Sequence, residues 1–338
     1  MKALSKANYV RKSLRLGGSF MSGNYIHCNL QVTYRCNFRC EICDFWKPEY
    51  QRLEELTVAD VRTVADKLSE LGTFLVSLAG GEPLIRDDLD KVIGILAEDH
   101  FPILITNGWF IDEDRSKALF RWGLQEISVS LDYASAAKHD AMRGRPGAFD
   151  RAVKALELLR KNRPSPLNRV HMITVLMDDN IDEIEDLIRI ARDLQVTYLV
   201  TLYSFSRGKK AERLPKKDVS DFLVALKKKH PNFVSLSGYV KRFDEAIAKG
   251  GIGDCLAGKR YLNVDNRGNV ARCTETTDEP VGNILHEGML ILRDRLYRQN
   301  ETTPCAQCWT SCRGFAESMY RGNRLKNTLE FFNTIRPN

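Results

Sequence analysis

Between residues 28 and 205 the chain alternates short apolar runs with stretches of helical periodicity. From Val58 to Leu71, apolar residues recur at three- and four-residue steps, with Thr57 at the N-cap position and Gly72 after the last turn. A second stretch with this period covers residues 181–194. Most of the short runs are apolar throughout, as in strands whose two faces are both covered. The six predicted strands are NLQVTY, FLVSLAG, PILITNG, EISVSLD, VHMITVLM and TYLVTLYS.

Strand–helix units in succession predict parallel pairing with right-handed crossovers, and hence an α/β fold. Periodicity fits either a barrel or an open parallel sheet, and both place a site at the carboxyl ends of the strands. Residues 206–232 are lysine-rich without interleaved aromatics, which favours a solvated helix with its leader over nucleic-acid binding. The segment LNVDNRGNVARC predicts a hairpin that turns at Asn266–Gly268.

The composition is that of a packed globular protein, with 43% hydrophobic and 28% charged residues among 338. No apolar run is long enough to span a membrane and no secretory signal is evident, which predicts a cytoplasmic protein. The start of the chain contributes much of the net charge of +7. We interpret it as a solvated arm or first helix, with contact to an anionic partner or membrane surface as the alternative; its basic residues, with no acid among them, are Lys2, Lys6, Arg11, Lys12 and Arg15.

The nine cysteines fall into two groups, which in a reducing compartment indicates metal or redox chemistry. Cys28 stands apart in the first predicted strand and is expected to be a small buried residue. Cys36, Cys40 and Cys43 follow that strand with the spacing C-x3-C-x2-C. A structural zinc site needs four closed ligands, whereas a four-iron cubane held by three thiolates keeps one iron open for a ligand.

This triplet after the first strand of a parallel α/β domain resembles the signature of the radical S-adenosylmethionine (SAM) enzymes. The resemblance covers about residues 28–205. It implies a partial (β/α)6 TIM-like barrel and a 4Fe-4S cluster whose open iron binds SAM. It also implies reductive cleavage of SAM to a 5′-deoxyadenosyl radical that abstracts a substrate hydrogen, with an electron donor such as flavodoxin or ferredoxin.

Further motifs at the following strand ends resemble the same family. AGGEP at 79–83 is similar to its GGEP motif, in which glycines admit the ligand and the glutamate receives the methionine amine. ITNG and SVSLD are similar to its third and fourth strand ends, and HDAMRGRPG to the stretch that supplies an arginine for the methionine carboxylate. The fifth strand is expected to line the adenine through its backbone. The cofactor contacts implied are Gly80, Gly81, Glu82, Pro83, Asn107, Ser130, Asp132, Arg143 and Leu176.

The second group of cysteines resembles the beginning of the SPASM and twitch extensions of this superfamily, because Cys255 and Cys273 form C-x12-G-x4-C. One auxiliary 4Fe-4S cluster is implied, with Cys305 and Cys308 as its other ligands. Cys312 either replaces one of these four or stays free. A zinc ribbon is the alternative. The predicted domains are a basic arm at 1–27, a radical SAM partial barrel at 28–249, and a small cysteine-rich cluster-binding region at 250–338.

These features favour a radical enzyme that oxidises or cross-links a peptide or protein. One alternative is radical oxidation or rearrangement of a small polar metabolite, such as a sugar or nucleotide. A non-catalytic binding protein stapled by zinc or by clusters is the alternative from another class. The sequence assigns no residue as a general base, and it predicts neither a nucleic-acid partner nor a transmembrane segment.

Overall fold

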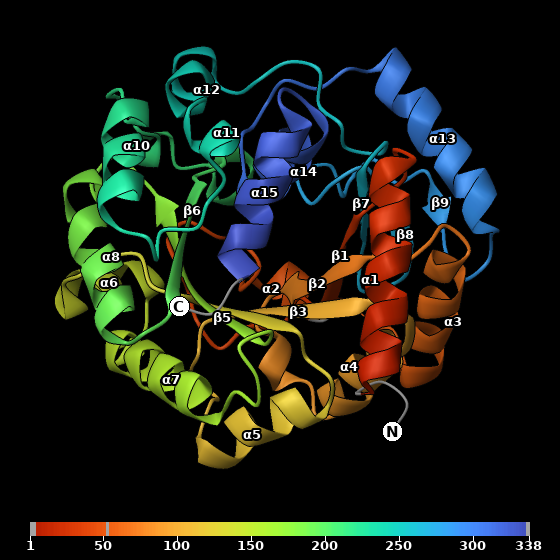
Figure 1. The fold of residues 1–338 in the computed structure, drawn as a ribbon, viewed down its shortest axis with the longest axis horizontal. Helices are drawn as coiled ribbons and strands as arrows, with labels where there is room; N and C mark the ends of the chain where they lie inside the picture. The colour runs from red at the N-terminus through yellow and green to blue at the C-terminus, as the bar shows by residue number, and fades with distance from the viewer. Residues whose placement is uncertain (1–4, 52–53, 336–338) are drawn as a thin grey trace.

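In the computed structural model of the protein, which describes residues 5–51 and 54–335, a curved parallel sheet is surrounded by helices (Figure 1). The sheet has nine strands in the described residues, in the order β6-β5-β4-β3-β2-β1-β7-β8-β9. Every pair from β6 across to β7 is parallel. The strands are β1 (His27–Thr33), β2 (Leu75–Gly80), β3 (Phe101–Thr106), β4 (Glu126–Ser130), β5 (Arg169–Leu176), β6 (Thr197–Leu202), β7 (Tyr261–Val264), β8 (Asn269–Ala271) and β9 (Gly282–Asn283).

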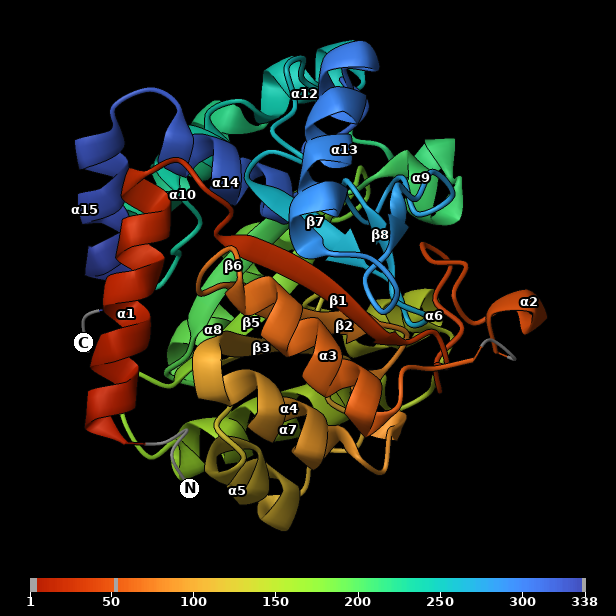
Figure 2. The same ribbon diagram turned by 90° about the vertical axis from the view of Figure 1, so that its right-hand side faces the viewer.

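The helices follow the strands in alternation and lie on the outside of the sheet (Figures 1 and 2). The predicted partial barrel of six strand–helix units is therefore confirmed. The helices are α1 (Lys6–Met21), α2 (Pro48–Gln51), α3 (Val58–Ser69), α4 (Leu89–Asp99), α5 (Glu113–Arg121), α6 (Ala136–Arg143), α7 (Ala148–Asn162), α8 (Ile184–Asp193), α9 (Phe205–Gly208), α10 (Ser220–Lys229), α11 (Ser237–Val240), α12 (Phe243–Lys249), α13 (Met289–Thr302), α14 (Ser311–Tyr320) and α15 (Arg324–Ile335).

Helix α3 illustrates why the sequence folds in this way. Thr57 and Asp60 form a capping box, in which each side chain accepts a hydrogen bond from the other residue's backbone N–H. The apolar stripe of the helix, which includes Val61, Val64 and Leu68, is buried in the main core. The cap fixes where the helix begins, and the stripe fixes the face that it turns to the sheet.

The basic N-terminal segment is a docked helix in its described part, and its charges are largely used within the protein. Lys12 is buried, and its Nζ donates 2.8 Å hydrogen bonds to the carbonyl oxygens of Ala97 and His100, at the end of α4. Arg11 forms an ion pair with Asp99 at 2.8 Å. Cations at the carboxyl end of a helix satisfy its last carbonyls and its dipole. The prediction of a solvated segment is wrong for Lys12; Lys2 lies outside the described residues.

The predicted hairpin is present as β7 and β8, which pair antiparallel and turn at Gly268, where φ is +85°. Strand β7 also pairs parallel with β1, so the sheet continues across the predicted domain boundary at residue 250. The two predicted domain boundaries stay predictions. The lysine-rich segment 206–232 contains most of α9 and all of α10. Within the described part of the chain, no helix has the length and apolar character to cross a membrane.

Candidate active site

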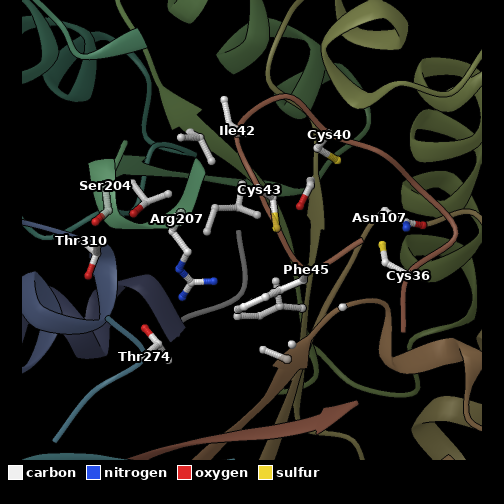
Figure 3. Close-up of a pocket in the computed structure, with 18 of the residues that line it drawn as sticks. Cys36, Cys40, Ile42, Cys43, Phe45, Asn107, Ser204, Arg207, Thr274 and Thr310 are labelled. Carbon is white, nitrogen blue, oxygen red and sulfur yellow. The ribbon is translucent and has the colours of Figure 1, made fainter. Parts of the chain in front are cut away.

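A cavity of about 270 Å³ opens at the carboxyl ends of the parallel strands (Figure 3). Its wall is built from the loop after β1, the ends of β2 to β6, and the residues at the start of α14. This is the position expected for a site in a parallel α/β fold. The residues predicted from sequence that line it are Cys36, Cys40, Cys43, Gly80, Gly81, Glu82, Asn107, Ser130, Arg143 and Cys312.

The three cysteines after β1 lie in one tight loop and all line this cavity. The Cys43 N–H donates to the Cys40 carbonyl oxygen at 3.3 Å, and the Cys36 N–H donates to Gln51 Oε1 at 3.3 Å. Burial raises the pKa of the Cys36 thiol to about 12 and that of Cys40 to about 11. At neutral pH these groups are thiols, so binding of an iron–sulfur cluster has to displace their protons.

Gly80 and Gly81 allow the end of β2 to lie directly against the backbone of this cysteine loop. A Cβ on Gly80 would be 2.0 Å from the Thr33 carbonyl oxygen, and one on Gly81 would be 2.1 Å from that of Arg35. Gly80 also has φ +118°, a conformation that L side chains rarely adopt. The motif therefore needs glycine to seat the cysteine loop on β2.

Glu82 joins the ends of β2 and β3 beneath the cavity. Its buried carboxylate accepts hydrogen bonds from Thr106 Oγ1 at 2.7 Å and from the backbone N–H groups of Asn107 at 2.8 Å and Leu84 at 3.1 Å. Burial raises its pKa to about 7 against the opposing effect of these bonds. Pro83 does not line the cavity and instead begins a short 3-10 turn, Pro83–Ile85.

Arg143, from the end of α6, links the cysteine loop to a buried carboxylate. Its Nη2 donates to Asp132, which is fully buried, and its Nη1 lies 4.0 Å from Cys40 Sγ. Its buried Nε has no hydrogen-bond partner among the described residues. A cationic donor of this kind on a cavity wall is suited to a carboxylate ligand.

Asp132 and Leu176 do not line this cavity, and their contacts with the cofactor stay predictions. Asp132 Oδ1 accepts from the Val175 N–H at 2.8 Å, and its other oxygen holds Arg143. On β5 the lining residues are Ile173 and Val175, because alternate side chains face the barrel interior. Leu176 faces the core, and its carbonyl oxygen accepts from the Tyr203 N–H at 3.1 Å.

The asparagine predicted at the end of β3 is held by the cysteine loop. Asn107 Nδ2 donates to Asn37 Oδ1 at 2.9 Å, and Asn107 Oδ1 accepts from the Trp109 N–H at 2.9 Å. Ser130, at the end of β4, lines the cavity as predicted. Asn107 therefore ties β3 to the cysteine loop at the rim of the site.

Sequence reasoning missed an ion pair in the cavity wall, Arg207 with Glu275 at 2.9 Å (Figure 3 labels Arg207). Glu275 also accepts from Ser204 Oγ at 2.7 Å, and the Arg207 guanidinium lies 5.5 Å from the centre of the Phe45 ring. Arg207 belongs to the lysine-rich segment 206–232, for which the sequence predicts a solvated helix. The composition of this segment does not predict the ion pair, because Glu275 is 68 positions away in sequence.

Four of the five C-terminal cysteines gather at a second place, around the start of β7. Cys255 and Tyr261 share a small buried cluster against which Cys273 and Cys305 pack. Burial raises the pKa of Tyr261, and the thiols of Cys255, Cys273 and Cys308 raise it further. Cys255 Sγ is 3.2 Å from Tyr261 Oη, and the Cys255 N–H donates to the Cys305 carbonyl oxygen at 3.4 Å. These four cysteines are the set that the resemblance implies for the auxiliary cluster, and that ligand set stays a prediction.

The backbone and a buried cation support this second group. A Cβ on Gly251 would lie 1.9 Å from the Ala306 carbonyl oxygen, so glycine lets this loop pack on the Cys305–Cys308 turn. Arg313 is buried and donates to the carbonyl oxygens of Cys308 and Gly253, both at 2.8 Å. Arg313 also pairs with the buried carboxylate of Glu317 at 2.7 Å.

Cys312 is separate from these four thiols. It lines the first cavity, and its Sγ donates to Asn29 Oδ1 at 3.5 Å. The donor sets are thus three thiols in the cavity loop and four around Tyr261. In the described residues no group of three Cys, His, Asp or Glu side chains surrounds a single metal ion. In a cubane site the cysteine sulfur atoms lie farther apart than the ligands of a single ion, because each thiolate binds a separate iron.

Residues 30–191 match the model of the radical SAM superfamily, so this part of the chain is a radical SAM domain. Members of this superfamily use a 4Fe-4S cluster and SAM, in agreement with the three-thiol loop and the cation beside it. The predictions of the superfamily and of these cofactors are confirmed.

Relatives of the chain include proteins named as a maturase, a peptide cyclase and a heme synthase. It is 27% identical over 308 residues to the mycofactocin maturase MftC of Mycolicibacterium smegmatis, covering 84% of this chain and 76% of that protein. It is 31% identical over 166 residues to the PqqA peptide cyclase of Gluconobacter oxydans, covering 48% and 45%. It is 30% identical over 197 residues to an AdoMet-dependent heme synthase of Methanosarcina barkeri, covering 57% and 55%. The chain thus spans about half the length of two of these three relatives.

Solved structures agree in fold. Streptococcus suis SuiB bound to its precursor peptide SuiA has a TM-score of 0.62 at 14% identity, covering 85% of this chain and 70% of that chain. Native anSMEcpe with bound AdoMet has a TM-score of 0.64 at 16% identity, covering 91% and 96%. At these identities the likeness establishes the fold alone.

Proposed function

We propose that this protein cleaves SAM reductively and uses the resulting radical to abstract hydrogen from a peptide or protein substrate, which is then oxidised or cross-linked. The observation that carries the proposal is the convergence of Cys36, Cys40, Cys43 and the unpartnered Nε of Arg143, among the described residues, on one cavity. The names of MftC, the PqqA cyclase and SuiB with its precursor peptide support a peptide as substrate.

The roles of the residues follow from their chemistry. Cys36, Cys40 and Cys43 would hold a 4Fe-4S cluster with one open iron, Arg143 would bind the methionine carboxylate, and Glu82 would accept from the methionine amine. When bound and reduced by one electron, these groups supply a 5′-deoxyadenosyl radical that takes a hydrogen atom from the substrate. Ile42 and Phe45 in the wall exclude water from the site.

The four cysteines around Tyr261 would hold one auxiliary 4Fe-4S cluster. Four thiolates leave no open iron, which suits electron transfer from an oxidised substrate rather than substrate binding. The first electron comes from a donor such as flavodoxin or ferredoxin. We propose a cytoplasmic location, because a reducing compartment keeps cysteines as thiols and contains donors of this kind.

Purification without oxygen tests the enzymatic assignment. The protein should be brown, with about eight irons per chain as two cubanes. With SAM and dithionite it should form 5′-deoxyadenosine. A colourless protein that holds stoichiometric zinc and forms no 5′-deoxyadenosine would instead indicate the non-catalytic binding protein.

The substrate class needs a separate experiment. Co-expression with short peptides encoded beside the gene should give a peptide whose mass or fragmentation pattern changes, and a Cys40→Ala variant should leave it unchanged. A change confined to a small polar metabolite under the same conditions would contradict the peptide assignment.

The buried carboxyl group of Glu82 predicts a pH-dependent affinity for SAM. Its pKa of about 7 means that raising the pH from about 6 to about 8 ionises it, and a carboxylate accepts from the methionine amine more strongly than a carboxyl group does. Glu82→Gln keeps an acceptor for the Asn107 N–H but does not titrate. The ratio of wild-type to Glu82→Gln affinity, measured by anaerobic equilibrium dialysis, should therefore rise several-fold over this range. An unchanged ratio would exclude Glu82 as the amine acceptor.

A further inference from the structure

The fifth C-terminal cysteine faces the reaction cavity. Cys312 is in the first turn of α14 and lines the same cavity as the three cysteines of the loop after β1. After burial, the ionisable groups that influence its thiol are Arg207 and Glu275, whereas Cys308 is influenced by Cys273, Glu275 and Cys255. Cys312 thus belongs to the cavity and not to the thiols around Tyr261.

Two unsatisfied polar groups lie beside this thiol on β1. Asn29 and Gln31 are 2% and 1% exposed, and both line the cavity. Asn29 Oδ1 accepts from Cys312, and Gln31 Nε2 donates to Asn263 Oδ1 at 3.1 Å. Among the described residues, Asn29 Nδ2 and Gln31 Oε1 have no partner. A free donor and a free acceptor, two residues apart on one strand face, are the complement of a single peptide amide.

Helix α14, which carries Cys312, begins across the cavity from Cys36 and Cys40. Figure 3 shows Thr310 and Thr274 across the cavity from Cys36 and Cys40, with Arg207 between them. Thr310 is the N-cap of α14, two residues before Cys312. A substrate amide held by Asn29 and Gln31 would therefore lie between the cysteine loop and Cys312.

We propose that Cys312 donates a hydrogen atom to the substrate carbon radical formed in this cavity. This inference rests on the proposed function and adds a redox-neutral outcome, inversion at the attacked carbon, to oxidation or cross-linking. One face of the carbon loses hydrogen toward the cysteine-loop side, and the other face receives hydrogen from Cys312.

The step balances in atoms and electrons. The S–H bond of Cys312 breaks homolytically as a C–H bond forms at the substrate carbon. The unpaired electron stays on sulfur. One electron from a low-potential one-electron reductant, of the class that starts the reaction, and one proton from solvent restore the thiol.

Turnover with SAM alone tests this proposal, with dithionite as reductant and in deuterated water. The Cys312 thiol exchanges to S–D, and in the absence of substrate it is the weak bond that the radical meets in the cavity. Wild type should form 5′-deoxyadenosine with one deuterium, read by mass spectrometry. Cys312→Ala and Cys312→Ser should both form unlabelled 5′-deoxyadenosine. The serine variant keeps a hydrogen-bond donor for Asn29, but its O–H bond is too strong to give up hydrogen.

A second readout does not depend on turnover. Cys312→Ala should keep about eight irons per chain, whereas Cys308→Ala should lose about four. In the anaerobic holoenzyme, iodoacetamide should alkylate Cys312 ahead of the cluster cysteines. Loss of iron from Cys312→Ala, or deuterium labelling that is the same in all three proteins, would overturn the inference. Absence of 5′-deoxyadenosine from wild type would overturn the proposed function itself.

Discussion

Cys40→Ala is expected to abolish 5′-deoxyadenosine formation and to lower the iron content by about four per chain. Cys40 lines the cavity between Cys36 and Cys43 in the loop, and two thiolates do not hold a cubane that also has to bind SAM. Anaerobic iron analysis and chromatography of the nucleoside product measure both effects. The second group of thiols keeps its own iron, so the loss should be half and not complete.

Cys28→Ala is the matched control for this prediction. Cys28 is fully buried in β1, the strand that precedes the loop, and it belongs to neither set of gathered thiols. Its truncation should cost about 1 kcal/mol of stability and leave the iron content unchanged. Full iron retention in Cys40→Ala would show that the three-thiol loop does not hold a cluster.

Arg143→Leu is expected to remove measurable SAM binding and to lower the free energy of unfolding by about 3–5 kcal/mol. The substitution removes the donor for the methionine carboxylate. It also leaves Asp132, at 0% side-chain exposure, without its charge partner. Anaerobic equilibrium dialysis with SAM and urea unfolding measure the two effects separately.

The same substitution in an exposed ion pair provides the control. Arg192 pairs with Asp193 on the outer surface of α8, with side-chain exposures of 56% and 66%. Arg192→Leu should change the free energy of unfolding by less than about 0.5 kcal/mol and leave SAM affinity unaltered. If Arg143→Leu binds SAM like the wild type, the carboxylate belongs elsewhere in the cavity.

The fold could be predicted because its signals are local. Strands buried on both faces are continuous apolar runs, and α3 has its own capping residues, so β1 to β6 and α3 were found from periodicity. The cysteine loop and the glycines at 80 and 81 were found because close packing of backbone on backbone restricts residue type.

The features that could not be predicted depend on contacts between segments that are distant in sequence. Whether Asp132 or Ser130 faces the cavity is decided by the residue at which β4 ends, which periodicity does not fix. Lys12 is buried because α1 docks on the end of α4, and Arg207 finds Glu275 across 68 positions of sequence. Each residue read alone is typical of a solvated surface.

Strand β1 lies between β2 and β7, and it leads to one group of thiols while β7 begins at the other. Two iron centres attached in this way would be separated by a hydrogen-bonded ladder and not by a hinge. Their spacing, and with it the rate of electron tunnelling between them, would then be a fixed property of the scaffold that substrate arrival leaves unchanged.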